Sequence, residues 1–456
     1  MGANYCLPFR RGKTGGVMFE IRKYQQDIIP AALAILRKNY MVWLTGEERA
    51  GKTVPALGIM KDGGFKKALC ITTLKAAIDI KKVYGSFADH FELDFINYES
   101  VHKVLSKKND YQIVWIDESH KLGQAPVPAQ VVKTVRIICE NKYIIYSSAT
   151  PSAEGFYKLY HQLYVSSASP LAKWPNFYAF AKEFINITTR RVAAGREVKV
   201  YTDVKMDKLS PLINHLFITW TREDAGFKVN AEDHFHCVKM SDQCIQIFNR
   251  LNRDKMYQAG DGAVATVSGG GDLLNKLSQI GSGTLIFDGE TDGRIIDASK
   301  AEHIKQFFHS KKIAIFYKYV SEGKLLRAYF PNHTDDAAHF NNSGSEVVFI
   351  GQVRSFCEGV DLSSADCLIN YNLDHSATVY SQSRARILSY HRTKPAPVYY
   401  IFSEHGIDNK IYQAVSSKRN FTLYYYQNNV GKSHSIKNNE SINQTRLVGA
   451  PASSSI

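Results

Sequence analysis

The sequence predicts an α/β protein made of two blocks, each a mainly parallel sheet flanked by helices. Apolar runs that favour β-strands alternate with helical patterns over the first ~230 residues, and a second alternating series begins near residue 233. Strands that alternate with helices are typical of parallel α/β sheets. With 456 residues, the chain is long enough for two or three domains.

The first block is predicted to span residues 18–228, after an N-terminal extension over 1–17. Its predicted strands are 41–45, 68–73, 91–97, 113–117 and 143–149, and its predicted helices are 23–38, 74–84 and 99–107. Residues 152–228 are rich in aromatics and are predicted to form a mostly helical appendage. For the aromatics near 156–180 we favour core packing over stacking on nucleic-acid bases.

The second block is predicted to span residues 229–428, with strands at 312–319, 346–351, 367–372 and 397–402. Between 258 and 284 the chain is rich in Gly and Ser, with Gly269, Gly270 and Gly271 at the centre, so a loop is predicted there. The polar tail over 429–456 is predicted to be disordered.

Composition narrows the class of protein. The formal net charge is +14, which favours a polyanionic partner such as nucleic acid, although a basic surface without that role is also common. The seven cysteines form no C-x-x-C pair, so neither zinc nor a disulfide framework is expected, and most of them read as small core residues. No signal peptide or membrane span is apparent, so we expect a cytoplasmic protein.

Residues 46–53, GEERAGKT, carry the strongest functional signal. They match G-x-x-x-x-G-K-[ST] at every fixed position, between an apolar strand and a predicted helix. In such a loop backbone N–H groups surround phosphate oxygens, the lysine reaches the β/γ-phosphates and the hydroxyl binds Mg²⁺. The predicted nucleotide-binding residues are Gly46, Glu47, Glu48, Arg49, Ala50, Gly51, Lys52 and Thr53.

Two acidic residues lie at the end of a later apolar strand, in the sequence IVWIDESH. Asp117 at this position suits Mg²⁺ coordination together with Thr53, and Glu118 is placed to orient or deprotonate an attacking water. A solvated acidic pair at a strand end is the ordinary alternative. Here the pair follows a phosphate loop in the same chain, so the catalytic interpretation is preferred.

The order of these motifs resembles that of the superfamily 2 helicases and translocases, over roughly residues 18–428. IRKYQQ resembles the adenine-reading segment, with Arg22, Tyr24 and Gln25. ITTLKAA and INYESV resemble nucleic-acid-contacting motifs, which implicates Thr73, Lys75, Tyr98 and Glu99. IDESH resembles the DEAH-type motif II, and SSATP resembles motif III, so His120, Ser148 and Thr150 are predicted to couple hydrolysis to movement. Lys121 and Glu358 are unranked further candidates.

The second block continues the resemblance. KIAIFYKYVSEG at 312–323 resembles motif IV, and FCEGVDLSSAD at 356–366 resembles motif V, which places Asp361 among the nucleotide-binding residues. YSQSRARIL resembles motif VI and assigns Gln382 and Arg386 to catalysis at the γ-phosphate. The usual second arginine is replaced by Ser389, with Arg384 or Arg392 as substitutes ranked below Arg386.

The resemblance implies two tandem RecA-like domains that close on ATP and Mg²⁺ and pass DNA along with each cycle. The spacing around TREDAGF at 221–227 looks like the chromatin-remodeller branch, whereas the compact size looks like bacteriophage branch-migration helicases, whose compartment is the host cytoplasm. The leading expectation is a DNA helicase acting on forks and four-way junctions. The alternatives are an RNA helicase and a nucleic-acid-binding remodelling subunit with weak ATPase activity. Protein partners are not indicated.

Overall fold

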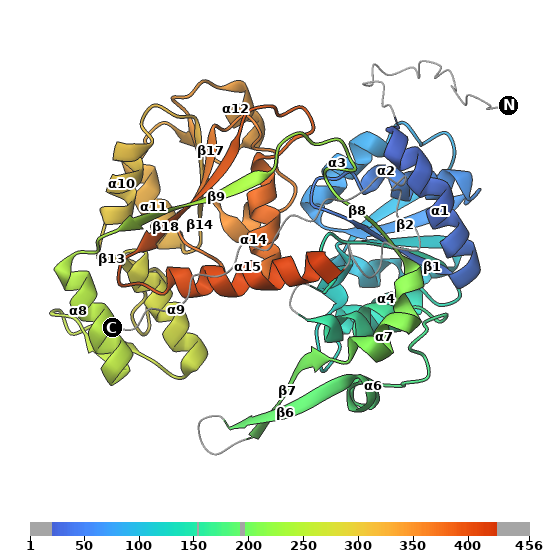
Figure 1. Ribbon diagram of the computed structural model, residues 1–456, viewed down its shortest axis with the longest axis horizontal. Coiled ribbons are helices and arrows are strands. Elements are labelled where there is room, and N and C mark those ends of the chain that lie inside the picture. Colours follow the sequence, from blue (N-terminus) through green and yellow to red (C-terminus); the bar gives the residue numbers. More distant parts are fainter. Residues whose placement is uncertain (1–20, 153–154, 192–196, 426–456) are drawn as a thin grey trace, which may run out of the picture.

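The structure, a computed structural model, describes residues 21–152, 155–191 and 197–425. The predicted extension over 1–17 and the predicted tail over 429–456 lie outside the described residues. Figure 1 shows two lobes side by side, each with a central sheet and helices on both of its faces.

The first sheet has six parallel strands in the order β3-β2-β4-β5-β1-β8. Its strands are β1 (Met41–Gly46), β2 (Lys67–Thr72), β3 (Glu92–Asn97), β4 (Ile113–Asp117), β5 (Tyr143–Ser147) and β8 (Phe217–Trp220). The connecting elements are α1 (Lys23–Asn39), α2 (Thr53–Asp62), α3 (Leu74–Tyr84), α4 (Gln130–Ile138) and the 3₁₀ segments η1 (Tyr98–Asp110) and η2 (Ser119–Leu122).

Strand β1 shows why these residues form a central strand. All of its residues are buried, and successive side chains point to opposite faces. Val42 and Leu44 pack with α1 and α2 on one face, whereas Met41 and Trp43 pack with η1 and α4 on the other. A strand covered on both faces is expected to read as a continuous apolar run.

The segment after β5 is mixed, with strands beside the helices predicted for 152–228. It contains η3 (Phe156–Lys158), α5 (Leu159–Tyr164), α6 (Phe177–Phe184), α7 (Met206–Ile213) and η5 (Asn214–Leu216). It also contains an antiparallel pair, β6 (Ile185–Arg191) and β7 (Glu197–Val204), and it ends in β8, which pairs with β1. The prediction of helices holds for α5, α6 and α7 but missed these strands, where β-branched residues are frequent over 185–204 and propensity favours strand. The aromatics Phe156, Tyr160, Phe177 and Phe180 lie in the core, as favoured.

The second sheet is also six-stranded and parallel, in the order β15-β16-β14-β17-β18-β9. Its strands are β9 (Ala231–Val238), β14 (Ile313–Tyr317), β15 (His333–Thr334), β16 (Val348–Gln352), β17 (Cys367–Asn370) and β18 (Ala396–Ser403). Its helices are α8 (Asp242–Asp254), α9 (Gly270–Gly281), α10 (Ser299–Phe307), α11 (Val320–Tyr329), α12 (Ala337–Asn342), α13 (Val353–Phe356), α14 (Ala377–Arg384) and α15 (Asp408–Tyr425), with η6 (Ala385–Ile387) after α14.

The predicted loop over 258–284 is another correction. Gly270 and Gly271 begin helix α9, with Gly269 as its N-cap, and Leu277 and Ile280 anchor the helix in the core. Two short antiparallel pairs flank it, β10 (Met256–Gln258) with β11 (Val264–Thr266) and β12 (Thr284–Leu285) with β13 (Arg294–Ile295). Apolar residues at helical spacing outweighed the low helix propensity of the glycines.

The two sheets confirm the predicted fold class of two tandem RecA-like domains, each a parallel sheet flanked by helices. Five of the cysteines within the described ranges are buried and Cys237 is exposed, all as free thiols, which agrees with the expected core role for most of them. Of the helices in the described part of the chain, none is long and apolar enough to cross a lipid bilayer.

Candidate active site

The phosphate-binding loop connects the end of β1 to the start of α2, where Thr53 is the first helical residue. Gly51 has φ +73°, a conformation that favours glycine, and an added Cβ would lie 2.7 Å from Tyr24 Oη. Lys52 Nζ donates to the carbonyl oxygens of Gly46 at 3.0 Å and Glu47 at 3.2 Å. The lysine ammonium therefore lies over the loop, where the phosphates of a nucleotide would bind.

Side chains from two other elements hold the loop in this shape. Tyr24 Oη at 2.9 Å and Trp220 Nε1 at 2.8 Å both donate to the carbonyl of Ala50. Gln25 Nε2 donates to the carbonyl of Gly51 at 3.2 Å. Tyr24 and Gln25 were predicted for the nucleotide site, but Trp220 was missed because no local motif contains it.

The carboxylate of Asp117 lies at the end of β4, as predicted. Its oxygens accept hydrogen bonds from Thr72 Oγ1 at 2.7 Å and Ser147 Oγ at 2.8 Å. Burial, followed by the charge of Glu118, raises the pKa of Asp117 to about 6, while the Lys52 charge acts to lower it. A half-buried, oriented carboxylate and a hydroxyl such as that of Thr53 are the kinds of oxygen ligand that Mg²⁺ prefers beside phosphates.

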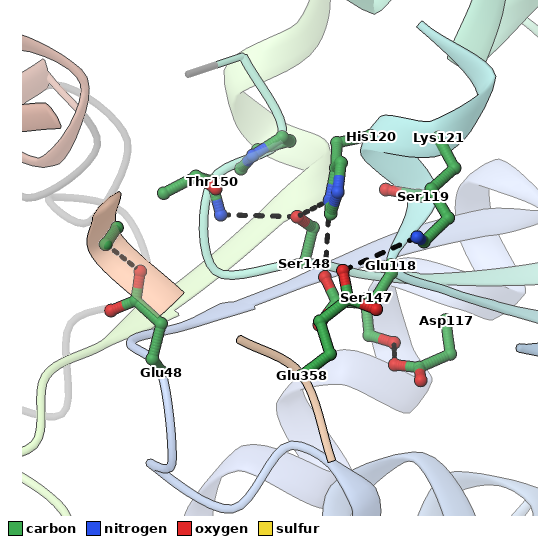
Figure 2. Close-up of polar contacts among 12 residues, drawn as sticks. Glu48, Asp117, Glu118, Ser119, His120, Lys121, Ser147, Ser148, Thr150 and Glu358 are labelled. Carbon is green, nitrogen blue, oxygen red and sulfur yellow. Dashed lines mark hydrogen bonds and ion pairs between the residues drawn. The ribbon is translucent and has the colours of Figure 1, made fainter. Parts of the chain in front are cut away.

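Glu118 leads into a cluster that joins the predicted coupling residues (Figure 2). Its backbone is left-handed at φ 51°, and its Oε2 lies 3.2 Å from His120 Nδ1. Burial raises the pKa of Glu118, but the His120 contact and the Lys52 charge outweigh it, so the net pKa is lowered. His120 Nδ1 also lies 3.1 Å from Ser148 Oγ, which accepts from the Thr150 N–H at 3.2 Å. The two motifs thus meet directly.

Arg386 brings the second domain to the phosphate loop. Its Nη1 and the Nη1 of Arg49 both donate to the carbonyl of Val360, at 3.4 and 3.2 Å, and its Nε donates to the Gln382 carbonyl at 2.9 Å. Burial, followed by the nearby Arg49 charge, lowers the pKa of Arg386 to about 10. Two close guanidinium groups beside a phosphate loop favour a polyanionic ligand.

The two substitutes considered for the missing motif VI arginine are used elsewhere. Arg384 pairs with Asp233 at 2.7 Å, and Arg392 Nη1 donates to the carbonyls of Ser363 and Ala365. Both are therefore structural within the second domain, and Arg386 is the arginine of this segment that lies beside the loop.

Ser389 itself lines a pocket between the domains, of about 280 Å³. Its neighbour Tyr390 stacks under Arg22, with the guanidinium carbon 3.8 Å from the ring centroid. The remaining lining residues are Gln25, Arg49, Gly51, Thr53, Val54, Val83 and Phe227. Of the predicted adenine-reading residues, Arg22 and Gln25 thus share one pocket with the phosphate loop, whereas Tyr24 does not line it. Tyr390, absent from the sequence prediction, lines the pocket from the second domain.

The acidic residues of the loop face the protein. Glu47 Oε2 accepts from the Arg222 N–H at 2.9 Å, and Glu48 Oε2 lies 3.4 Å from Arg222 Nη1. Glu48 also accepts from Ser381 Oγ on α14, a contact drawn in Figure 2. Asp361, predicted to bind nucleotide, pairs with Arg49 Nη2 at 2.8 Å. Glu48 and Arg49 therefore link the loop to the second domain.

The four residues predicted to contact nucleic acid lie in different environments. Thr73 caps α3 by accepting from the Ala76 N–H at 3.2 Å, and Lys75 Nζ lies 4.0 Å from the Phe356 ring centroid in the second domain. Glu99 is exposed and accepts from Asn97 Nδ2 at 2.8 Å. Tyr98 is a correction: only 7% is exposed, and its hydroxyl donates to the backbone carbonyl of Asp117. Its role is to support motif II.

Comparison with known proteins shows sequence similarity over a short part of the chain. No family model matches the chain. Over 80 residues, 18% of this chain, it is 34% identical to Helicase swr1 of Aspergillus fumigatus, and the match spans 5% of that protein's length. The Sulfolobus solfataricus SWI2/SNF2 ATPase core domain is 15% identical with a TM-score of 0.40, over 93% of this chain and 92% of that chain. The fold assignment rests on the strand order above.

Proposed function

We propose that this protein is an ATP-dependent translocase that unwinds or remodels branched DNA. The observation that carries the proposal is the position of Arg386, which lies in the second domain beside Arg49 of the phosphate loop in the first. A phosphate loop alone would indicate nucleotide binding. An arginine delivered across a domain boundary is the arrangement that stabilises charge during phosphoryl transfer. The stretch similar to Helicase swr1 supports this class.

The chain's own residues divide the work of hydrolysis. Lys52 and the loop N–H groups would bind the phosphates, and Thr53 and Asp117 would hold Mg²⁺, which supplies charge neutralisation. Glu118, kept ionised by His120, would accept a proton from the attacking water. Arg386 would stabilise the charge that develops on the transferred phosphoryl group.

Movement would follow from contacts that cross the domain boundary. Arg49 pairs with Asp361, and Lys121 Nζ lies 3.4 Å from Glu358 Oε1. Loss of the γ-phosphate would remove the ligand that draws Arg386 toward the loop, so the domains would separate. Lys121 directly follows His120, which contacts motif III, so the state of the γ-phosphate could reach the domain boundary through this pair.

The proposed partner is DNA with single-stranded and duplex arms, such as forks and four-way junctions, in replication, recombination or repair. The net charge of +14 supports a phosphate-rich partner whose binding weakens as salt rises. Translocation needs backbone contacts and no reading of base sequence. A cytoplasmic location, in the host if the gene belongs to a phage, is part of the same proposal.

An ATPase assay across nucleic-acid structures tests the proposal. Single-stranded, duplex, forked and four-way-junction DNA are compared with RNA strands and duplexes of the same length. We expect the largest stimulation with forked or four-way DNA. Greater stimulation by RNA would replace DNA with RNA as the substrate. If no nucleic acid stimulates the ATPase activity of correctly folded protein, the motor function is excluded and a nucleic-acid-binding subunit becomes the preferred function.

A further inference from the structure

The antiparallel ribbon β6–β7 is a feature that the proposed mechanism leaves unused. Figure 1 shows its two strands projecting from the first domain beyond α6 and α7, apart from both six-stranded sheets. Its base is firmly anchored: Ile185 is buried, and the Tyr201 ring packs against Phe177 with centroids 5.2 Å apart. The Lys205 N–H donates to the Phe184 carbonyl at 2.8 Å and closes the base.

Beyond the base, the ribbon is open to solvent. Asn186, Ile187, Thr188, Thr189 and Arg191 on β6 and Glu197, Val198 and Lys199 on β7 are all exposed. Ile187 is 40% exposed and Val198 is 48% exposed, on strands that would ordinarily bury such β-branched side chains. An isolated two-stranded ribbon is only marginally stable in water, so one held out by an anchored base indicates a surface kept for a partner.

The charge of this region favours an anionic partner. Residues 173–208 hold eight basic and four acidic side chains. Opposite residues of an antiparallel pair share a face, and the register places Thr189 opposite Lys199 and Arg191 opposite Glu197. Arg191 is 83% exposed in its ion pair with Glu197. An exposed pair of this kind is weak, so its guanidinium can be exchanged for a phosphate.

The ribbon is connected to the catalytic cleft through aromatic packing. Motif III ends at Pro151, which lines a second pocket between the domains, of about 340 Å³, together with Lys158 of η3. In the same turn, the Tyr157 ring lies 6.4 Å from Phe177, the residue that also holds Tyr201 of β7. The rings of Tyr157, Phe177 and Tyr201 therefore form a packed series from η3 to the base of the ribbon.

We propose that the β6–β7 ribbon binds a duplex arm of the DNA substrate, through the phosphates and the major groove. The B-DNA major groove is about 12 Å wide and admits a two-stranded β-ribbon. One face carries Arg191 and Lys199 for the phosphates, with Thr189 between them, whereas Val198 lies on the other face of the ribbon. The inference rests on the proposed function and names the part of the substrate that this element holds.

The test compares the double variant Arg191→Ala/Lys199→Ala with wild-type protein. Fluorescence anisotropy measures the binding of labelled single-stranded, duplex and forked DNA between about 50 and 200 mM salt. We expect roughly ten-fold weaker binding of duplex and forked DNA, with a salt slope lower by about two, since two phosphate contacts are lost. Binding of single-stranded DNA and ATPase stimulation by it stay at the wild-type level.

The matched control is Arg37→Ala/Lys38→Ala, which removes one exposed Arg and one exposed Lys from α1 of the same domain. It is expected to bind all three DNAs like wild type. If the ribbon variant binds duplex DNA as tightly as wild type, the proposal is overturned. The alternative is then that the exposed ribbon edges pair with a strand of a partner protein. Equal losses on single-stranded and duplex DNA also overturn it, since they reflect general charge. Failure of the proposed function is a separate result, seen as wild-type ATPase that no nucleic acid stimulates.

Discussion

At the scale of single residues, the phosphate loop owes its shape to side chains outside the motif. Gly51 is required by its positive φ, whereas Gly46 is required by space, because an added Cβ would lie 2.3 Å from a ring carbon of Trp220. Trp220 also donates to the Ala50 carbonyl. The motif's two glycines therefore have different physical reasons, and only the structure separates them.

Lys52→Ala tests the loop itself. Removing the ammonium that lies over the loop is expected to lower ATP turnover by about 10²–10³-fold, the usual effect of losing one charge-stabilising donor. Steady-state phosphate release measures turnover, and anisotropy checks that DNA binding persists. Lys61→Ala, in the last turn of the same helix, is the control and should keep wild-type turnover. Equal turnover in Lys52→Ala would exclude this loop as the hydrolytic site.

Tyr390→Ala tests the base pocket. The ring contacts Arg22 at 3.8 Å across the domain boundary, and a cation–π contact is worth about 0.5–2 kcal/mol. We expect the KM for ATP to rise roughly ten-fold with a smaller change in kcat, because the ring would bind the base and not the reacting phosphate. Tyr390→Phe keeps the ring and should behave like wild type. A fall in kcat at constant KM would contradict this role.

At the scale of elements, helix α15 is fastened by a buried ion pair. Asp408 Oδ1 lies 3.3 Å from Lys300 Nζ of α10, and Oδ2 accepts from the Ser403 N–H at 3.0 Å. The two charged side chains are 5% and 4% exposed, so neither charge is screened by water. The position of α15 therefore depends on a pair that the helix cannot form alone.

Asp408→Asn leaves Lys300 as an uncompensated buried charge. We expect a loss of about 3–5 kcal/mol in the free energy of unfolding, the usual result of removing one partner of a buried pair. Urea denaturation followed by circular dichroism measures it. In Asp292→Asn the broken pair, with Lys324, is exposed, and the loss should stay within about 1 kcal/mol. Similar small losses in both variants would show that the buried pair is not needed.

The aromatic insertion after motif III contains a buried histidine with a predictable acid response. Burial lowers the pKa of His161 below its ordinary 6.5, although its contact with the Gln124 carbonyl opposes this. Near pH 6.5 the imidazole of His161 therefore binds a proton in the unfolded chain but not in the folded chain. The free energy of unfolding falls as pH drops from about 6.5 toward the lower pKa of the folded state. His161→Gln should lose less stability than wild type between pH 7.5 and 5.5. Equal losses in urea midpoint would contradict this.

Much of the element level was predictable. Parallel strands buried on both faces leave long apolar runs, which is why the predicted runs in both blocks match strands of the two six-stranded sheets. The failures lie where local signals conflicted. Gly269–Gly271 indicated a loop, but they lie at the start of α9. The aromatic residues around 156–180 suggested helices, and the strands of the ribbon at 185–204 were not predicted. At α9 tertiary packing overrode the low helix propensity of the glycines, whereas at 185–204 the local strand propensity itself was overlooked.

At the scale of the whole molecule, the contacts that hold the domains together at the site include Arg49–Asp361, Lys121–Glu358 and Glu48–Ser381. The first two are partly exposed ion pairs, each worth about 0–1 kcal/mol. Under the proposed function, contacts this weak would allow the domains to open and close with the state of the nucleotide. These two ion pairs therefore contribute little free energy to the closed arrangement of the domains.

Glu358→Gln weakens one of these contacts and tests that balance. Losing at most about 1 kcal/mol shifts the closed population by up to about five-fold, so the KM for ATP should rise by no more than that factor. Small-angle scattering should show a larger radius of gyration without nucleotide and the wild-type value with a non-hydrolysable ATP analogue. Glu92→Gln removes a pair within the first domain and is the control. An unchanged radius in the nucleotide-free variant would contradict the role of this pair.

The sequence by itself determined the position of the phosphate loop, the acidic residue at the end of β4 and the two parallel sheets, because periodicity and motif spacing are properties of neighbouring residues. Tertiary structure decided which distant residues complete the site. Arg49 and Val360, 311 positions apart, meet only when the two domains pack against each other. Packing between the domains also brought Tyr390 to Arg22. Packing within the first domain buried Tyr98, brought Trp220 to the phosphate loop and left the β6–β7 ribbon exposed beyond its base. Long-range packing carries no local sequence signature, so these contacts had to be read from the fold.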